Sequence, residues 1–120
     1  MGLAMAAGLA SAGANLLIVN RTERDGQIAA EEISKGFGVK ALSFAADISK
    51  EEETNAMAEF AMEAFGSIDI LINSAGINIR GAIDEVSLED FNKVMEINVT
   101  GTWLCSRSVI PHMKAQKSGA

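Results

Sequence analysis

The chain has 120 residues, enough for one small domain with its own core. Hydrophobic residues make up 48% of it and the net charge is −6, which excludes a disordered chain and argues against a nucleic-acid surface. Its single cysteine, Cys105, excludes an internal disulfide, and no apolar run reaches the ~20 residues of a membrane helix. We therefore expect a globular cytoplasmic protein with no nucleic-acid or membrane partner.

The first half of the chain alternates helical and extended patterns. Residues 3–12 are rich in Ala, Leu and Met, which favours a helix ending at Gly13. The apolar run 16–19 is typical of a strand buried on both faces. Thr22 is expected to cap a helix that runs to about Lys35 and is broken by Gly36 and Gly38. A second strand is expected over 39–45.

The next stretch repeats this alternation. Ser49 and Glu52 predict a capping box for a helix that Gly66 ends. The core-facing positions of that helix are expected at Met57, Ala58, Ala61 and Phe65. Residues 68–72 are predicted to form a third strand.

A long helix is predicted to close the chain. Ser87 and Asp90 resemble a helix cap, and the helix should run toward Pro111 with a distortion near Gly101. Its inward-facing residues are expected to be Leu88, Phe91, Val94 and Met95. We expect the polar tail, 115–120, to be frayed.

This alternation predicts an α/β fold with right-handed connections and a doubly wound parallel sheet. No internal repeat or linker interrupts it. Residues 1–120 are therefore interpreted as a piece of one domain.

Two candidate sites lie near the amino terminus. Gly2 opens a helix, where free N–H groups can bind a phosphate, but no G-x-G-x-x-G precedes it and the alternative is a flexible terminus. Asn20 and Arg21 follow the first strand, where an arginine can accommodate a ribose 2′-phosphate. The alternative is an exposed arginine at a helix start.

Further candidates follow the second and third strands, because ligands of open α/β sheets lie outside the carboxyl ends of the strands. These are Asp47 and the small-residue stretch Asn73-Ser74-Ala75-Gly76. Turn chemistry and an ordinary loop are the respective alternatives.

Polar residues on the last helix complete the candidates. Asn98 falls on its apolar stripe and is either a satisfied structural amide or a polar group directed into a cleft. His112 and Cys105 have no partners at metal-ligand spacing, so no metal site is expected. Cys105 should pack as a small hydrophobe.

Together these motifs resemble the short-chain dehydrogenase/reductase family over nearly the whole chain. Asn73-Ser74-Ala75-Gly76 is similar to that family's Asn-Asn-Ala-Gly motif, and Ile97-Asn98-Val99-Thr100-Gly101 to the stretch with its active-site asparagine. Asp47-Ile48 looks like the Asp-hydrophobic pair that contacts adenine, and Ile110–Met113 resembles the end of the same helix.

The resemblance implies a partial dinucleotide-binding Rossmann domain that lacks the first strand and the C-terminal strands. Only Gly2 matches the glycine-rich phosphate turn, and the catalytic Ser and Tyr-x-x-x-Lys have no counterpart in a chain without tyrosine. The implied cofactor-binding residues are Gly2, Asn20, Arg21, Asp47, Ile48, Asn73, Ser74, Ala75 and Gly76, and the implied catalytic residue is Asn98.

The implied activity is hydride transfer between a nicotinamide dinucleotide and a small alcohol or carbonyl substrate, with NADP expected and NAD possible. Asn98 would support a water relay, but it cannot supply the acid–base step alone, so we expect this chain to be inactive by itself. The alternative is a non-catalytic remnant that binds a nucleotide or a partner. The family also suggests a homo-oligomer formed through the long helix, 88–114.

Loss of the first strand has a physical consequence. It should leave a gap of about 9–10 Å between the strands at 16–19 and 68–72. Unpaired buried backbone is costly, so the sheet must close, borrow a strand or fold poorly. We therefore expect marginal stability and a tendency to associate, which a cooperative thermal transition in a dilute monomeric sample would refute.

Overall fold

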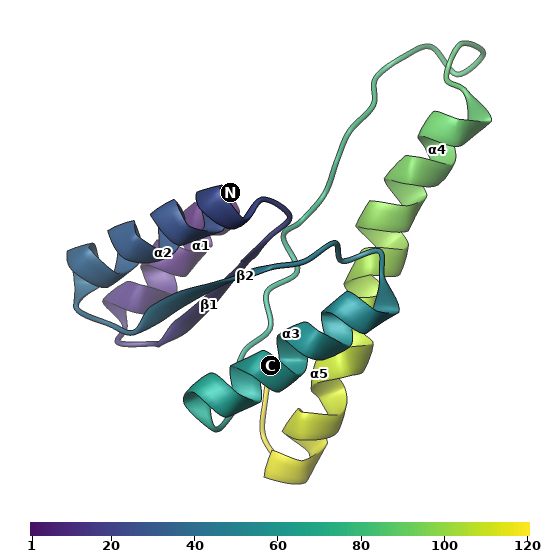
Figure 1. Ribbon diagram of the computed structural model, residues 1–120. Coiled ribbons are helices and arrows are strands. Elements are labelled where there is room, and N and C mark those ends of the chain that lie inside the picture. Colours follow the sequence, from purple (N-terminus) through teal and green to yellow (C-terminus); the bar gives the residue numbers. More distant parts are fainter.

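The computed structural model describes residues 1–120 as a small parallel sheet between two helical layers (Figure 1). Strand β1, Leu16–Asn20, pairs in parallel with β2, Ala41–Ala45, and Leu16 lies opposite Ala41. The predicted strands at 16–19 and 39–45 are thus confirmed with small shifts at their ends. Apolar, β-branched residues suit these positions because both faces of the sheet carry helices.

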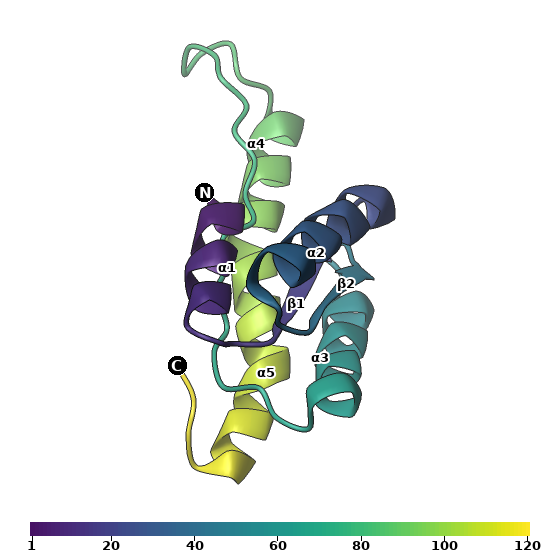
Figure 2. The same ribbon diagram turned by 90° about the vertical axis from the view of Figure 1, so that its left-hand side faces the viewer.

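Helices α1, Gly2–Ser11, and α2, Glu23–Phe37, cover one face of the sheet (Figures 1 and 2). Helix α2 approaches closely because Gly26 lacks a side chain there: a Cβ at Gly26 would lie 3.3 Å from the Cβ of Ser43 on β2. Ala30 and Ile33 of α2 are buried.

Helices α3, Glu51–Phe65, and α5, Thr102–Gln116, pack together on the other face (Figure 1). Met57 and Ala58 of α3 meet Cys105 and Val109 of α5 to form the central core cluster. Burial raises the pKa of the Cys105 thiol, so this residue packs as the neutral small hydrophobe that the sequence predicted. Only 14 of the 120 residues are buried, so the core is small for a chain of this length.

The helix ends show which local signals are decisive. Gly38 and Gly66 end α2 and α3 in the left-handed conformation, with φ of 69° and 79°. Ser87 caps the next helix by accepting a hydrogen bond from the Asp90 N–H, as predicted. The predicted capping box at Ser49 is wrong, because the N-cap of α3 is Lys50 and no side chain caps the helix. The Ser49 hydroxyl instead donates a hydrogen bond to Asp47.

The predicted third strand at 68–72 does not join the sheet, which consists of β1 and β2 alone. Its backbone pairs instead with the end of the chain: the Leu71 N–H donates to the Ala120 carbonyl, and the Ala120 N–H to the Asp69 carbonyl, both at 2.9 Å. The Gln116 side chain bonds both backbone groups of Ile68. The expectation of a frayed tail at 115–120 is therefore wrong. Residues 68–72 have no strand beside them in the sheet and so form no regular strand.

The last helix consists of three segments: α4, Leu88–Met95, the π-helix η1, Glu96–Gly101, and α5. The distortion predicted near Gly101 is confirmed. Three of the residues expected to face inward are exposed, namely Leu88 at 73%, Phe91 at 54% and Met95 at 41%, because α4 extends beyond the sheet (Figure 1).

The molecule is elongated as a result. Its radius of gyration is 15.4 Å, against about 13–14 Å for a compact domain of this length. None of the helices combines the length and the apolar character needed to cross a membrane.

Candidate functional site at the carboxyl edge of the sheet

A cavity of about 440 Å³ with a mostly apolar lining opens between α1, β1 and the 68–75 segment. Six of the predicted cofactor-binding residues line it: Gly2, Asn20, Ile48, Asn73, Ser74 and Ala75. The carboxyl end of β1 and the end of the 68–72 segment thus meet at one mouth, which is where open α/β sheets bind their ligands.

The start of α1 forms one wall of this mouth. A Cβ at Gly2 would lie 2.5 Å from the Ser74 Oγ, so a larger residue at position 2 would displace that hydroxyl. The N–H groups of Gly2 and Leu3 make no hydrogen bond, whereas those of Ala4 and Met5 both donate to the Met1 carbonyl. The mouth therefore contains free donors at the positive end of a helix.

Asn20 and Arg21 lie at the end of β1. The Asn20 Oδ1 accepts a hydrogen bond from the Thr22 N–H at 3.2 Å, so it is Asn20, and not the predicted Thr22 side chain, that binds an N–H at the start of α2. Arg21 is exposed and makes no ion pair. Its guanidinium is free to bind an anionic group.

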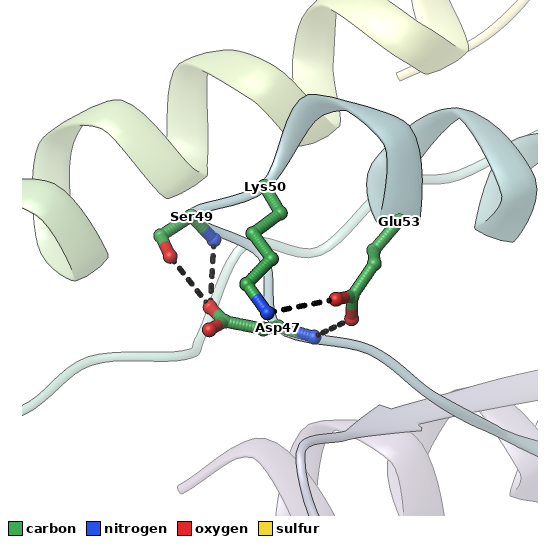
Figure 3. A network of polar contacts seen from close by, with 4 residues as sticks. All are labelled: Asp47, Ser49, Lys50 and Glu53. Atoms are coloured by element: carbon green, nitrogen blue, oxygen red, sulfur yellow. Dashed lines mark hydrogen bonds and ion pairs between the residues drawn. The ribbon is translucent and has the colours of Figure 1, made fainter.

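Asp47 belongs to a compact polar network after β2 (Figure 3). Its Oδ1 accepts hydrogen bonds from the Ser49 hydroxyl at 2.7 Å and the Ser49 N–H at 3.0 Å. Its own N–H donates to the Glu53 Oε2 at 2.6 Å, and Glu53 pairs with Lys50 at 3.2 Å. Lys50 and Glu53 were not predicted as parts of this site.

The network keeps two carboxyl groups ionised. Hydrogen bonds from the Ser49 side chain and backbone lower the pKa of Asp47, and the positive charges of Lys50 and Arg21 lower it further. The hydrogen bond from the Asp47 N–H lowers the pKa of Glu53. Asp47 therefore presents a fixed negative charge, and its Oδ2 makes no hydrogen bond within the protein.

The Asn73–Gly76 stretch leaves the end of the 68–72 segment. Asn73 Nδ2 donates to the Ser106 Oγ on α5 at 3.3 Å. A Cβ at Gly76 would lie 3.3 Å from the Asn98 Oδ1, so a small residue is needed where this loop meets the helix.

Asn98 joins that loop to the π-helix. Its Oδ1 accepts from the Ile77 N–H, and its Nδ2 donates to the Ile77 carbonyl, both at 2.8 Å. Asn98 is exposed although it falls on the apolar stripe expected from the sequence, and both polar atoms of its amide are hydrogen-bonded. Ile77 was not foreseen, because no local pattern indicates the partner of a side chain 21 residues away.

Four predicted residues lie outside the cavity lining: Arg21, Asp47, Gly76 and Asn98. Ile48 connects the residues that line the cavity with those outside it. It lines the cavity and also packs on η1. A Cβ at Gly101 of η1 would lie 2.7 Å from the Ile48 Cδ1. No three His, Cys, Asp or Glu side chains lie close enough together to hold a metal ion.

A profile of the family described as short chain dehydrogenase matches residues 1–120. The chain belongs to the short-chain dehydrogenase family. Among curated relatives, glucose 1-dehydrogenase 2 of Bacillus subtilis is 38% identical over 100 residues, covering 82% of this chain and 39% of the relative. Trans-4-hydroxycyclohexanecarboxylate dehydrogenase of Sinomonas cyclohexanicum is 34% identical over 120 residues, covering 96% of this chain and 46% of its own length.

Solved short-chain dehydrogenase structures confirm the fold. A short-chain type dehydrogenase/reductase from Mycobacterium marinum superposes with a TM-score of 0.91 at 31% identity, covering 96% of this chain and 46% of that one. L-sorbose reductase of Gluconobacter frateurii, complexed with NADPH and L-sorbose, gives 0.87 at 34% identity, with coverages of 96% and 44%. The predicted α/β Rossmann class is thus confirmed, and the chain spans less than half the length of these relatives.

Proposed function

We propose that residues 1–120 form the adenosine-binding part of a dinucleotide-binding Rossmann domain in an NAD(P)-dependent short-chain oxidoreductase. The observation that carries this proposal is the meeting of Gly2, Asn20 and the Asn73–Ala75 stretch at one mouth. The nicotinamide ring supplies hydride transfer to or from an alcohol or carbonyl carbon when the dinucleotide is bound.

The residues at the mouth fit a dinucleotide chemically. The free N–H groups of α1 suit a phosphate, and the free Oδ2 of Asp47 suits the amino group of adenine. Small side chains at Ser74, Ala75 and Gly76 leave the backbone open to a sugar or a flat ring. Ile48 adds an apolar contact beside Asp47.

Arg21 favours NADP over NAD in this proposal. It is exposed and unpaired, it lies close enough to Asp47 to influence its pKa, and it follows the strand whose end contacts the ribose in this fold. A guanidinium there would pair with the 2′-phosphate that distinguishes the two cofactors.

Asn98 is assigned a positioning part. Both atoms of its amide are engaged with Ile77, so it fixes the loop after Gly76 relative to the long helix. The sequence contains no tyrosine, so residues 1–120 cannot carry out the proton transfer that the tyrosine of the family's Tyr-x-x-x-Lys motif would perform. We expect residues 1–120 to bind the dinucleotide without turning over a substrate.

Fluorescence titration tests the proposal. NADPH and NADH are titrated with the wild-type chain, Arg21→Ala and Arg80→Ala, the last being a matched control in the exposed loop. Arg21→Ala should weaken NADPH binding by about tenfold and leave NADH and the control unchanged. Absence of any fluorescence change with either cofactor would refute the binding proposal, and hydride transfer to a carbonyl substrate would refute the expected inactivity.

The long helix is proposed as the surface of a homo-oligomer. Leu88, Phe91, Met95, Val99 and Trp103 are all exposed by two fifths or more. Their spacing of three or four residues places them along the length of α4, η1 and the start of α5. Large exposed apolar side chains that follow one another along a helix are typical of an interaction surface.

A further inference from the structure

Ser49 directs two hydrogen-bond donors at the same oxygen atom of Asp47 (Figure 3). The Asp47 Oδ1 accepts from the Ser49 hydroxyl at 2.7 Å and from the Ser49 N–H at 3.0 Å. No hydrogen bond reaches the Oδ2 from within the protein. Ser49 therefore determines which of the two carboxylate oxygens is left open to a ligand.

The charged groups around Asp47 do not occupy that open oxygen. Neither Lys50 nor Arg21 forms an ion pair with Asp47. The Lys50 ammonium lies 3.2 Å from the Glu53 carboxylate instead. Glu53 also accepts the Asp47 N–H at 2.6 Å, so this one carboxylate holds both the backbone of Asp47 and the lysine. The Asp47 Oδ2 thus remains an available acceptor.

The chain places this acceptor next to the cavity, because Asp47 immediately precedes Ile48, which lines it. A flat ring that packs on Ile48 would therefore meet Asp47 at its edge. At neutral pH an aspartate accepts hydrogen bonds and donates none, since its ordinary pKa is about 3.9. The open oxygen attracts an N–H group on the ring edge and repels a carbonyl oxygen.

We propose that Ser49 sets the base specificity of this site: it holds the Oδ1 of Asp47 and leaves the Oδ2 as a fixed acceptor, which selects a 6-amino purine over a 6-oxo purine. This role rests on the proposed function, because it requires the dinucleotide to place its purine against Ile48. It goes further by assigning the choice of base to Ser49 and by excluding hypoxanthine and guanine dinucleotides as ligands.

The same geometry dictates what an amide would do in place of the carboxylate. In Asp47→Asn, both Ser49 donors require the amide oxygen at the Oδ1 position, because an amide NH₂ group accepts no hydrogen bond. The Nδ2 then takes the place of the Oδ2, and the open acceptor becomes a donor. A donor there suits the carbonyl oxygen of a 6-oxo purine, so this variant should lose the preference for the amino group.

Fluorescence titration with NADPH and with its hypoxanthine analogue, which carries a 6-oxo group in place of the 6-amino group, measures this selection directly. The wild-type chain should bind NADPH about tenfold more tightly, since the analogue replaces a charge-assisted hydrogen bond with repulsion between two acceptors. Ser49→Ala should reduce the ratio to about threefold, because only the backbone bond from residue 49 then orients the carboxylate. Ser49→Thr retains the hydroxyl and should keep the wild-type ratio.

Ser67→Ala is the matched control, because Ser67 also donates to a carboxylate two residues away, that of Asp69 at 3.1 Å, and neither residue lines the cavity. It should leave the ratio unchanged. Equal wild-type affinities for the two dinucleotides, or equal effects of Ser49→Ala and Ser67→Ala on the ratio, would overturn the role of Ser49 alone. Binding of neither dinucleotide would refute the proposed function and this role with it. Circular dichroism verifies folding, and Asp47→Asn decides the outcome if Ser49→Ala unfolds.

Discussion

The side-chain amide of Asn98 forms a two-point hydrogen-bonded pair with the backbone of Ile77, with both bonds at 2.8 Å. A side chain that bonds both the N–H and the C=O of one residue reproduces the pairing of a sheet. It fixes the position of the 73–77 loop although that loop lies in no regular element.

Removing this pair should release the loop. Asn98→Ala is expected to lower the free energy of unfolding by about 1–3 kcal/mol, because two hydrogen bonds are lost. Exchange of the Ile77 amide should accelerate, while the α3 and α5 core amides change less. Asn92→Ala, an exposed asparagine on α4, is the control for asparagine removal. Equal effects of the two substitutions would show that the pair contributes nothing specific.

Ser49 should control the ionisation of Asp47. Ser49→Ala removes the hydroxyl that contributes most to lowering the Asp47 pKa but leaves the backbone hydrogen bond. The Asp47 pKa should therefore rise part of the way to its ordinary value, as followed by carboxyl ¹³C chemical shifts. Ser11→Ala, whose hydroxyl bonds only the Gly8 carbonyl, should leave it unchanged.

The Asp47 network also predicts a pH dependence of stability. The folded pKa values of Asp47 and Glu53 are lowered, so the unfolded chain binds more protons in acid. The stabilising contribution is present above the ordinary carboxyl range and is lost as the pH falls below about 4. Urea unfolding over about pH 3–6 should give a flatter profile for Asp47→Asn than for the wild type. Asp84→Asn, in the exposed loop, provides the comparison, and identical slopes for the two variants would contradict the assignment.

Two glycines should respond oppositely to the same change. A Cβ at Gly101 would meet the Ile48 Cγ1 at 2.8 Å, so Gly101→Ala should destabilise the protein by about 1–3 kcal/mol. Gly8→Ala in α1 meets nothing within 4 Å and should stabilise it by about 0.5–1 kcal/mol. Thermal melts compare the two. Ile48→Ala should rescue Gly101→Ala, and failure of this rescue would rule out the steric cause.

The exposed stripe on α4 and α5 predicts association. Phe91→Glu and Trp103→Glu should each shift the sedimentation velocity profile toward monomer, because a buried carboxylate opposes packing of apolar helix faces. Ile83→Glu is the control, since Ile83 is exposed but lies outside the stripe. A wild-type chain that is monomeric at every concentration would refute the proposed oligomer.

Sequence patterns predicted the elements whose stability is local. The helix ends at Gly38 and Gly66 and the cap at Ser87 depend on one or two adjacent residues, and the structure contains all three. The prediction of a strand at 68–72 was wrong because a strand forms only beside another strand, and the local sequence does not show which segment lies beside it. The Asn98–Ile77 pair and the Asn73–Ser106 contact were missed for the same reason: their partners lie 21 and 33 residues apart.

Asn98 was predicted to lie on the apolar stripe of the long helix, seven residues after Phe91, as though one face continued through the helix. The π-helix interrupts that face, since a π turn contains an extra residue and rotates the following side chains by about 100°. A residue of α4 and a residue of α5 that are a multiple of seven apart in the sequence therefore lie on different faces of the helix. Residues before Glu96 and after Gly101 follow separate helical phases, so heptad spacing does not identify the positions that share a face across η1.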